Sequence, residues 1–325
     1  MNSNIYSVVD MHTMGEPTRI VTSGLPYIPG NTMIEKRDYM QNHYDHVRKL
    51  LMNEPRGHEN MFGAVLVAPT NQNADYGVIF MDHGSYLAMC IHGSIGVATA
   101  AAKLGWSSKD TILLDTPAGL VTCKVTKDSS GNVKKVYLNN VPSFFVKTGS
   151  ITLEDKIISY KIAFGGNFFA LIDIHSLGME LDKKNATQLS KLGVKIRDLI
   201  NRQDLVVHPE LPNIRGVDLV EFYDISNHAN VVVFGNGQID RSPCGTGTSA
   251  QLSALFKEGA IKIEEEFPYR SIIGTEFVGK ILSTTTVGEY NAIIPQIGGE
   301  AWVTSLSQMV LEYNDPLETG FSLSS

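Results

Sequence analysis

Two short segments of the chain, "AMCIHGSI" at 88–95 and "DRSPCGTGT" at 240–248, share one pattern. Each places a single cysteine, Cys90 or Cys244, just ahead of a run of small residues. In both copies the run continues into apolar residues at three- and four-residue spacing, which is typical of a helix. The pattern leaves two alternatives: a pair of reactive thiols in one functional site, or two thiols buried in the core.

The similarity between the two segments extends beyond the cysteines. With Cys90 aligned on Cys244, four further pairs are identical: Gly93 and Gly247, Ala100 and Ala254, Lys103 and Lys257, and Gly105 and Gly259. Each copy thus contains a cysteine, a glycine-rich turn, about three helical turns and a glycine just past the helix end. The same offset brings residues 5–24 close to residues 158–178. The sequence therefore predicts a duplicated fold.

Most of the chain alternates short β-rich segments with turn residues. Segments such as "FGAVLVAPT" and "NVVVFGNG" are rich in β-branched and aromatic residues and are bounded by Gly, Pro, Asn or Asp. Helical spacing is found in fewer places, at 35–52, 92–104, 185–202 and 246–258. We therefore predict an α+β fold with long antiparallel stretches.

The duplication also predicts two domains. We place the first at residues 1–150 and the second at residues 151–325, so that each carries one of the two aligned cysteines. The boundary falls in the polar stretch "KTGSITLEDK" at 147–156. The sequence leaves open whether the final residues, 301–325, pack back on the first domain.

Composition and charge exclude several classes of function. The chain has 325 residues, of which 43% are hydrophobic and 19% charged, with a net charge of −7. Its 27 basic residues form no stripe, so we do not expect nucleic acid as a partner. The apolar runs are far too short to span a bilayer, and the N-terminal residues lack the features of a secretory signal. We therefore expect a cytoplasmic protein with no membrane association.

A cysteine at the start of a helix has a specific chemical environment. Unpaired backbone N–H groups and the positive end of the helix dipole favour the thiolate, the form that acts as a base or nucleophile. The same N–H groups can bind a carboxylate. If both thiols face one bound acid, one can remove a proton from a carbon while the other returns a proton to the opposite face. This chemistry needs no cofactor, and the sequence contains neither a Walker lysine loop nor a dinucleotide-binding glycine fingerprint.

The alternative for each cysteine is a small core residue, which is the commoner role of a lone cysteine. Cys123, in the alternating run "LVTCKVT", matches this alternative. Cys90 and Cys244 differ from it because glycine and hydroxyl residues lie beside both, at a predicted strand-to-helix turn.

Five motifs, in order, give the chain a resemblance to a known family. They are "DMHTMGEPTRIV" at 10–21, "PRGHENMFGA" at 55–64, "MCIHGSIG" at 89–96, "FGGNFFA" at 164–170 and "DRSPCGTGTSA" at 240–250. Through them the chain resembles the proline racemase family from end to end. The resemblance implies a diaminopimelate-epimerase-like fold, with two pseudo-symmetric α/β domains and the active site in the cleft between them. It also implies a homodimer that acts on proline or hydroxyproline.

The resemblance assigns Cys90 and Cys244 as the two acid/base thiols. The family positions that hold the substrate carboxylate and amino group are occupied by His92, Asp240, Gly245 and Thr246, and those that wall the ring pocket by Phe62 and Phe234. Relatives that dehydrate trans-3-hydroxyproline have threonine in place of the second cysteine, so Cys244 favours racemisation or epimerisation. Two aromatic walls suit the apolar ring of proline better than that of 4-hydroxyproline, whose buried hydroxyl would need a partner.

One residue departs from the family pattern. Ile91 stands where the family has a glycine after the first cysteine, at a position expected to contact the substrate. A β-branched side chain is strained at positive φ and adds bulk beside the thiol. Three functions therefore stay open: a proline racemase, a 4-hydroxyproline 2-epimerase, or a racemase-like protein of altered or lost activity.

Two further functions would use the same residues. A thiol hydrolase or transferase would need Cys90 as nucleophile and His92 as base, but side chains two apart at a helix start are expected to point in different directions. A metal site would need Cys90, His92 and Cys244 together as ligands. We predict neither of them.

Overall fold

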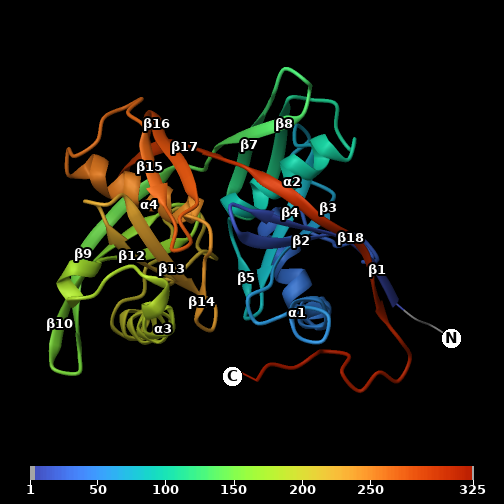
Figure 1. The fold of residues 1–325 in the computed structure, drawn as a ribbon, viewed down its shortest axis with the longest axis horizontal. Coiled ribbons are helices and arrows are strands. Elements are labelled where there is room, and N and C mark those ends of the chain that lie inside the picture. Colours follow the sequence, from blue (N-terminus) through green and yellow to red (C-terminus); the bar gives the residue numbers. More distant parts are fainter. Residues whose placement is uncertain (1–3, 324–325) are drawn as a thin grey trace. The chain divides into compact units, whose positions relative to one another are not determined.

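The computed structural model describes residues 4–323 and divides into two units (Figure 1). The first unit contains the residues up to Val136 together with those from Glu300 onward. The second unit is Tyr137–Gly299.

The first unit is built from two helices and a run of paired strands. Its elements are β1 (Asn4–Thr13), β2 (Glu16–Ser23), α1 (Met33–Met52), β3 (Phe62–Val67), β4 (Tyr76–Asp82), β5 (Tyr86–Leu87), α2 (Ile91–Lys103), β6 (Thr111–Thr116), β7 (Gly119–Lys127) and β18 (Ala301–Leu311), with β8 (Val133–Asn139) crossing the boundary. β1 pairs antiparallel with β18 and β2, β2 pairs parallel with β3, and β4 pairs antiparallel with β3 and parallel with β6.

The second unit repeats this plan. Its elements are β9 (Ser143–Leu153), β10 (Lys156–Phe164), β11 (Phe168–Asp173), α3 (Ala186–Gln203), β12 (Leu219–Asp224), β13 (Ala229–Phe234), β14 (Gln238–Ile239), α4 (Gly245–Lys257), β15 (Phe267–Arg270), β16 (Glu276–Val287) and β17 (Tyr290–Gly299), with two 3₁₀ turns, Ile174–Leu177 and Lys183–Asn185, before α3. β10 pairs antiparallel with β9 and β11, β11 pairs parallel with β12, and β13 pairs parallel with β15. The predicted duplication is thereby confirmed, since each pairing has its counterpart in the first unit.

A buried helix lies at the centre of each unit. In the first unit α2 contacts β1, β2, β3, β7 and β18, and in the second α4 contacts β9, β10, β11, β16 and β17 (Figure 1). Both helices have 13 residues and are buried along nearly their whole length. A helix that is covered on all sides needs small side chains so that the strands can approach, which is what the alanine, glycine, serine and threonine residues provide.

The four predicted helices are all confirmed. Equivalent glycines, Gly105 and Gly259, lie two residues past the ends of α2 and α4, each with φ of 73°. Only a residue without a Cβ adopts this left-handed conformation freely, and it closes the last helical turn.

The boundary between the units differs from the expected one near residue 150. The polar stretch at 147–156 is the end of an antiparallel hairpin of β9 and β10, turning at Glu154 and Asp155. Hairpin strands share a sheet, so this stretch lies inside the second unit. β18 pairs with β1 along its whole length, which places this final strand in the first unit.

No helix within residues 4–323 combines the length and the apolar character needed to cross a membrane.

Candidate active site

Cys90 is the N-cap residue of α2. Its backbone is extended, with φ of −148° and ψ of 117°, and its Sγ accepts a hydrogen bond from the Gly93 amide at 3.2 Å. Ser94 reinforces the turn, because its Oγ donates to the Cys90 carbonyl at 2.7 Å. The sulfur therefore lies over the unpaired N–H groups of the helix start, where negative charge is stabilised.

His92 contacts the same sulfur, with Nδ1 3.1 Å from Cys90 Sγ. The expectation that the two side chains point in different directions was wrong. It assumed helical geometry at both positions, whereas the extended backbone of Cys90 turns its side chain back over the first turn.

The His92 ring is a neutral group. Burial lowers the pKa of His92 to about 3, and a hydrogen bond to the Pro17 backbone opposes that shift only partly. Thr13 Oγ1 donates to the His92 carbonyl at 2.8 Å, and the Phe62 ring lies edge-on to the imidazole with centroids 4.5 Å apart. A neutral imidazole exchanges a hydrogen bond with the thiol but is a weak general base at neutral pH, which disfavours a hydrolase that uses this pair.

We expect His92 to show no titration step between about pH 5 and pH 8, because burial disfavours its charged form, whereas an exposed histidine titrates near 6.5. NMR spectra of histidine-labelled protein over that pH range provide the measurement, with His92→Gln used to assign the signal. A step near pH 6.5 in the His92 signal would contradict the neutral assignment.

Arg19 orders the loop that leads to Phe62. Its guanidinium forms a bidentate ion pair with Asp10 at 2.8 and 2.9 Å, and its Nη1 also donates to the carbonyls of Leu51 and Arg56. A planar guanidinium suits this simultaneous contact with a carboxylate and two carbonyls. The motifs at 10–21 and 55–64 thus meet at Arg19, and Phe62 follows at the start of β3, 1% exposed.

Ile91 is the first residue of α2 and is buried. It is not among the non-glycine residues with positive φ. Isoleucine at this place, where the resemblance implied glycine, therefore strains no backbone, and what it adds is the bulk of a side chain beside Cys90.

Cys244 holds the equivalent place before α4 but has a different backbone. Its φ of 53° and ψ of 97° lie in a region that non-glycine residues rarely adopt, and its side chain does not cap the helix. Such a conformation costs about 1–3 kcal/mol and persists only where the surroundings enforce it. Here the Cys244 amide donates to Ser242 Oγ at 3.1 Å, and the Ser242 amide donates to Asp240 Oδ1 at 2.8 Å.

Acidic groups surround the second thiol. Burial, followed by the negative charges of Asp240 and Glu221, raises the pKa of Cys244 well above its usual value. Burial also raises the pKa of Asp240 to about 6, against hydrogen bonds from Ser242 and Cys244. Thr246 Oγ1 lies 3.6 Å from Cys244 Sγ. The two thiols therefore lie in unlike electrostatic environments.

The expected site residues fall into two groups. Cys90, Ile91, His92 and Phe62 come together in the first unit, around the start of α2. In the second unit, Cys244, Gly245 and Thr246 form the start of α4, with Asp240 just before them. Phe234 ends β13, buried, and pairs with Gln238 in the strand that leads to Asp240.

The sequence reasoning missed Glu221 and Tyr269. Tyr269 Oη donates to Glu221 Oε1 at 2.7 Å, and both side chains are 0% exposed. The available signal was an acidic residue in the middle of the apolar run "VDLVEFYD".

Cys123 is buried in β7, where desolvation raises its pKa, as expected of a core thiol.

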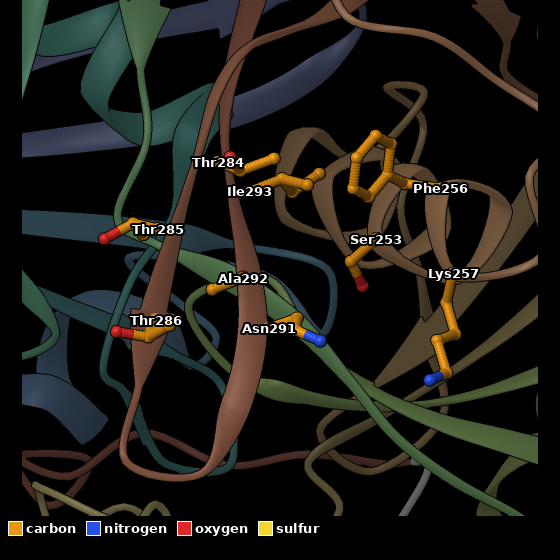
Figure 2. A pocket seen from close by; sticks show the side chains of 9 residues that line it. All are labelled: Ser253, Phe256, Lys257, Thr284, Thr285, Thr286, Asn291, Ala292 and Ile293. Carbon is orange, nitrogen blue, oxygen red and sulfur yellow. The ribbon is translucent and has the colours of Figure 1, made fainter.

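A cavity of about 480 Å³ lies in the second unit, beside the C-terminal end of α4 (Figure 2). Its lining includes Phe256, Lys257 and the Thr284–Thr286 segment of β16. None of the expected site residues lines it.

Among residues 4–323, no group of three or more His, Cys, Asp or Glu side chains is arranged to hold a metal ion.

Comparison with known proteins gives full-length matches. The family model described as proline racemase matches residues 8–322. A proline racemase of Acetoanaerobium sticklandii is 48% identical, covering 97% of both chains, and a 4-hydroxyproline 2-epimerase of Streptosporangium roseum is 42% identical, covering 98% of both. The crystal structure of a hydroxyproline epimerase from Agrobacterium vitis, with bound trans-4-hydroxy-L-proline, superposes with a TM-score of 0.94 at 32% identity, covering 99% of this chain and 96% of that one.

These matches confirm the α+β fold of the epimerase type that the motifs implied. With a family model that spans nearly the whole sequence and relatives above 40% identity, the chain belongs to the proline racemase family.

Proposed function

We propose that this chain is an isomerase that interconverts L- and D-proline without a cofactor, using Cys90 and Cys244 as its acid and base. The observation that carries the proposal is the duplication: equivalent helices of 13 residues each begin directly after a thiol. Full-length similarity to a proline racemase supports it.

In the proposed mechanism, both thiols act on one substrate α-carbon from opposite faces. A thiolate removes the α-proton, and the other cysteine, as a thiol, donates a proton to the opposite face. The enzyme is left with the two protonation states exchanged, so the reverse reaction uses the same pair. The N–H groups at the helix starts would hold the substrate carboxylate and stabilise the charge that develops on it.

Asp240 is proposed to bind the substrate ammonium. Its carboxyl is buried, and the Ser242 amide already holds Oδ1 at 2.8 Å. A cation placed against it would favour its ionised form, because an opposite charge lowers a carboxyl pKa. Binding of the substrate ammonium would therefore oppose the rise that burial causes in the pKa of Asp240.

The apolar ring of proline suits the two aromatic residues proposed to wall the pocket better than the hydroxylated ring of 4-hydroxyproline does. Phe62 and Phe234 are 1% and 3% exposed, and neither ring carries a polar atom that could bind a ring hydroxyl. An unpaired buried hydroxyl costs about 1–3 kcal/mol. 4-Hydroxyproline 2-epimerisation is the second candidate, supported by the similarity to the Streptosporangium roseum epimerase.

A substrate panel tests the proposal. We expect incorporation of solvent deuterium at Cα of both proline enantiomers, decay of optical rotation to zero, and a kcat/KM for proline roughly tenfold above that for 4-hydroxyproline. In Ile91→Gly the smaller side chain should reduce the ratio of the two kcat/KM values. Assays of both proteins under the same conditions measure this ratio. Binding of proline without exchange or racemisation would instead support a protein that has lost activity.

We also propose a cytoplasmic homodimer with no nucleic-acid partner. Sedimentation at twice the chain mass of 35.6 kDa would support the dimer, and sedimentation at the chain mass would contradict it.

A further inference from the structure

The residues that follow β18 return to the loop between α1 and β3. Figure 1 shows residues 312–323, the C-terminal segment, in red, continuing from β18 without a helix or strand. The α1–β3 loop is residues 53–61. Two hydrogen bonds join them, from the Phe321 amide to the Glu54 carbonyl at 2.9 Å and from Asn53 Nδ2 to the Thr319 carbonyl at 3.0 Å. A Cβ at Gly320 would lie 2.4 Å from the Glu54 carbonyl oxygen, so glycine permits the close approach of the two backbones.

Arg56 makes the most contacts between the loop and the end of the chain. Its Nε donates to the Val310 carbonyl at 2.9 Å, its Nη1 donates to the Leu317 carbonyl at 3.3 Å, and its Nη2 forms an ion pair with Asp315. The Leu317 amide donates to Asp315 Oδ1 at 2.8 Å and so holds that carboxylate in place. A guanidinium presents its donors in a rigid fork, so one side chain binds three places along the segment at once.

The same loop is held on its inner side. The Arg56 carbonyl accepts a hydrogen bond from Arg19, whose side chain is 5% exposed. At Gly57 an added Cβ would lie 2.3 Å from the Met52 carbonyl oxygen, and the Gly57 amide donates to the Asn53 carbonyl at 2.6 Å. The loop therefore lies against the end of α1, with Arg19 on its buried side and the C-terminal segment on its outer side.

The loop ends directly before Phe62. The Met61 amide donates to the His58 carbonyl at 2.8 Å, and the Asn60 amide lies 3.2 Å from His58 Nδ1. Phe62 follows, with its ring edge-on to His92 at 4.5 Å between centroids. A change in the order of the loop would therefore reach the aromatic residue proposed to wall the ring pocket.

We propose that Arg56 is a positioning residue that ties the α1–β3 loop to the C-terminal segment, so that the end of the chain helps to fix Phe62 in the ring pocket. The role in the pocket rests on the proposed function, whereas the ordering of the loop is a property of the protein alone. A pocket wall contacts the substrate ring equally in the ground state and the transition state. Its loss of order should therefore weaken substrate binding and leave the chemical step unchanged.

The test is a chain that ends at Leu311. β18 also ends at Leu311, so this variant keeps all of its pairing with β1. Hydrogen exchange followed by peptide mass spectrometry should accelerate roughly tenfold over residues 53–61, because local opening no longer breaks contacts with the C-terminal segment. KM for proline should rise several-fold with kcat nearly unchanged. Asp315→Ala, which removes only the ion pair and the bond to Leu317, should change both quantities in the same direction by less.

Asp110→Ala is the matched control, because it removes another ion pair of the first unit, that of Asp110 with Lys127 at 2.7 Å. It should alter neither loop exchange nor KM. Unchanged exchange over 53–61 in the shortened chain would overturn the proposal, and so would faster exchange with an unchanged KM in an active enzyme. If the shortened chain does not fold, Asp315→Ala decides by the same two criteria.

Hydrogen exchange needs no turnover, so this result is separate from the racemase assignment. If the wild type does not racemise proline, exchange in the peptide that contains Phe62 replaces KM as the second measurement. Faster exchange there in the shortened chain supports the positioning role, and unchanged exchange contradicts it.

Discussion

Replacing either Cys90 or Cys244 with serine will lower kcat/KM for proline racemisation by roughly 10²–10⁴-fold, the usual contribution of a general acid or base. An alcohol is too weakly acidic to supply the base near neutral pH, and each side chain must serve as acid in one direction and base in the other. Serine is close in size to cysteine, so the fold should be retained. Polarimetry from both enantiomers, together with thermal melting, measures the two effects separately.

Cys123→Ser is the control for this experiment. Cys123 is equally buried but lies in β7, so its replacement should affect stability without changing turnover per folded molecule. Full activity in either Cys90→Ser or Cys244→Ser would exclude the two-thiol mechanism.

Gly165→Ala will destabilise the second unit by about 3 kcal/mol or more, which is the upper range for overpacking a closed interior. A Cβ at Gly165 would lie 2.1 Å from the Thr246 carbonyl and 2.7 Å from the Ala250 amide, both backbone atoms of α4. Since backbone cannot rotate away as a side chain does, α4 must shift, and Cys244 at its start shifts with it. Denaturant unfolding measures the stability loss, and kcat/KM should fall in the protein that still folds.

Gly96→Ala is the comparison variant, because it adds the same methyl group at a buried glycine, here in the central helix α2. A Cβ there meets nothing closer than 3.5 Å, at Thr13 Oγ1. Alanine is the better helix former, so this variant should be as stable as the wild type or more so. Equal behaviour of the two alanine variants would refute the close approach of Gly165 to α4.

The sequence was sufficient to predict the repeat and the central helices, because these depend on local signals. A cysteine, a run of small residues and a terminal glycine mark both ends of α2 and of α4, and the structure places each helix within a residue of the expected range. The positive φ of Gly105 and Gly259 explains why glycine recurs at that place.

The boundary between the units and several contacts in the candidate site could not be predicted. The boundary depends on contacts between distant segments. Polar residues at 147–156 indicate a turn, but whether a turn separates domains or closes a hairpin is decided by pairing. Glu221 in β12 and Cys244 before α4 both border Gly247, and no local pattern contains that information. The Cys90–His92 contact was missed because the N-cap lies outside the helix and its dihedral angles do not follow helical spacing.

The pairing of β18 with β1 has a consequence for synthesis of the chain. β18 is synthesised after every residue of the second unit, yet it forms a strand next to β1. Domains generally fold as units while the chain emerges from the ribosome. The Cys244 unit can therefore be completed first. The Cys90 unit, most of which precedes it in the sequence, must wait for β18 with one edge of β1 unpaired. A nonsense mutation at residue 300 would spare the second unit, Tyr137–Gly299, and leave the first without its final strand.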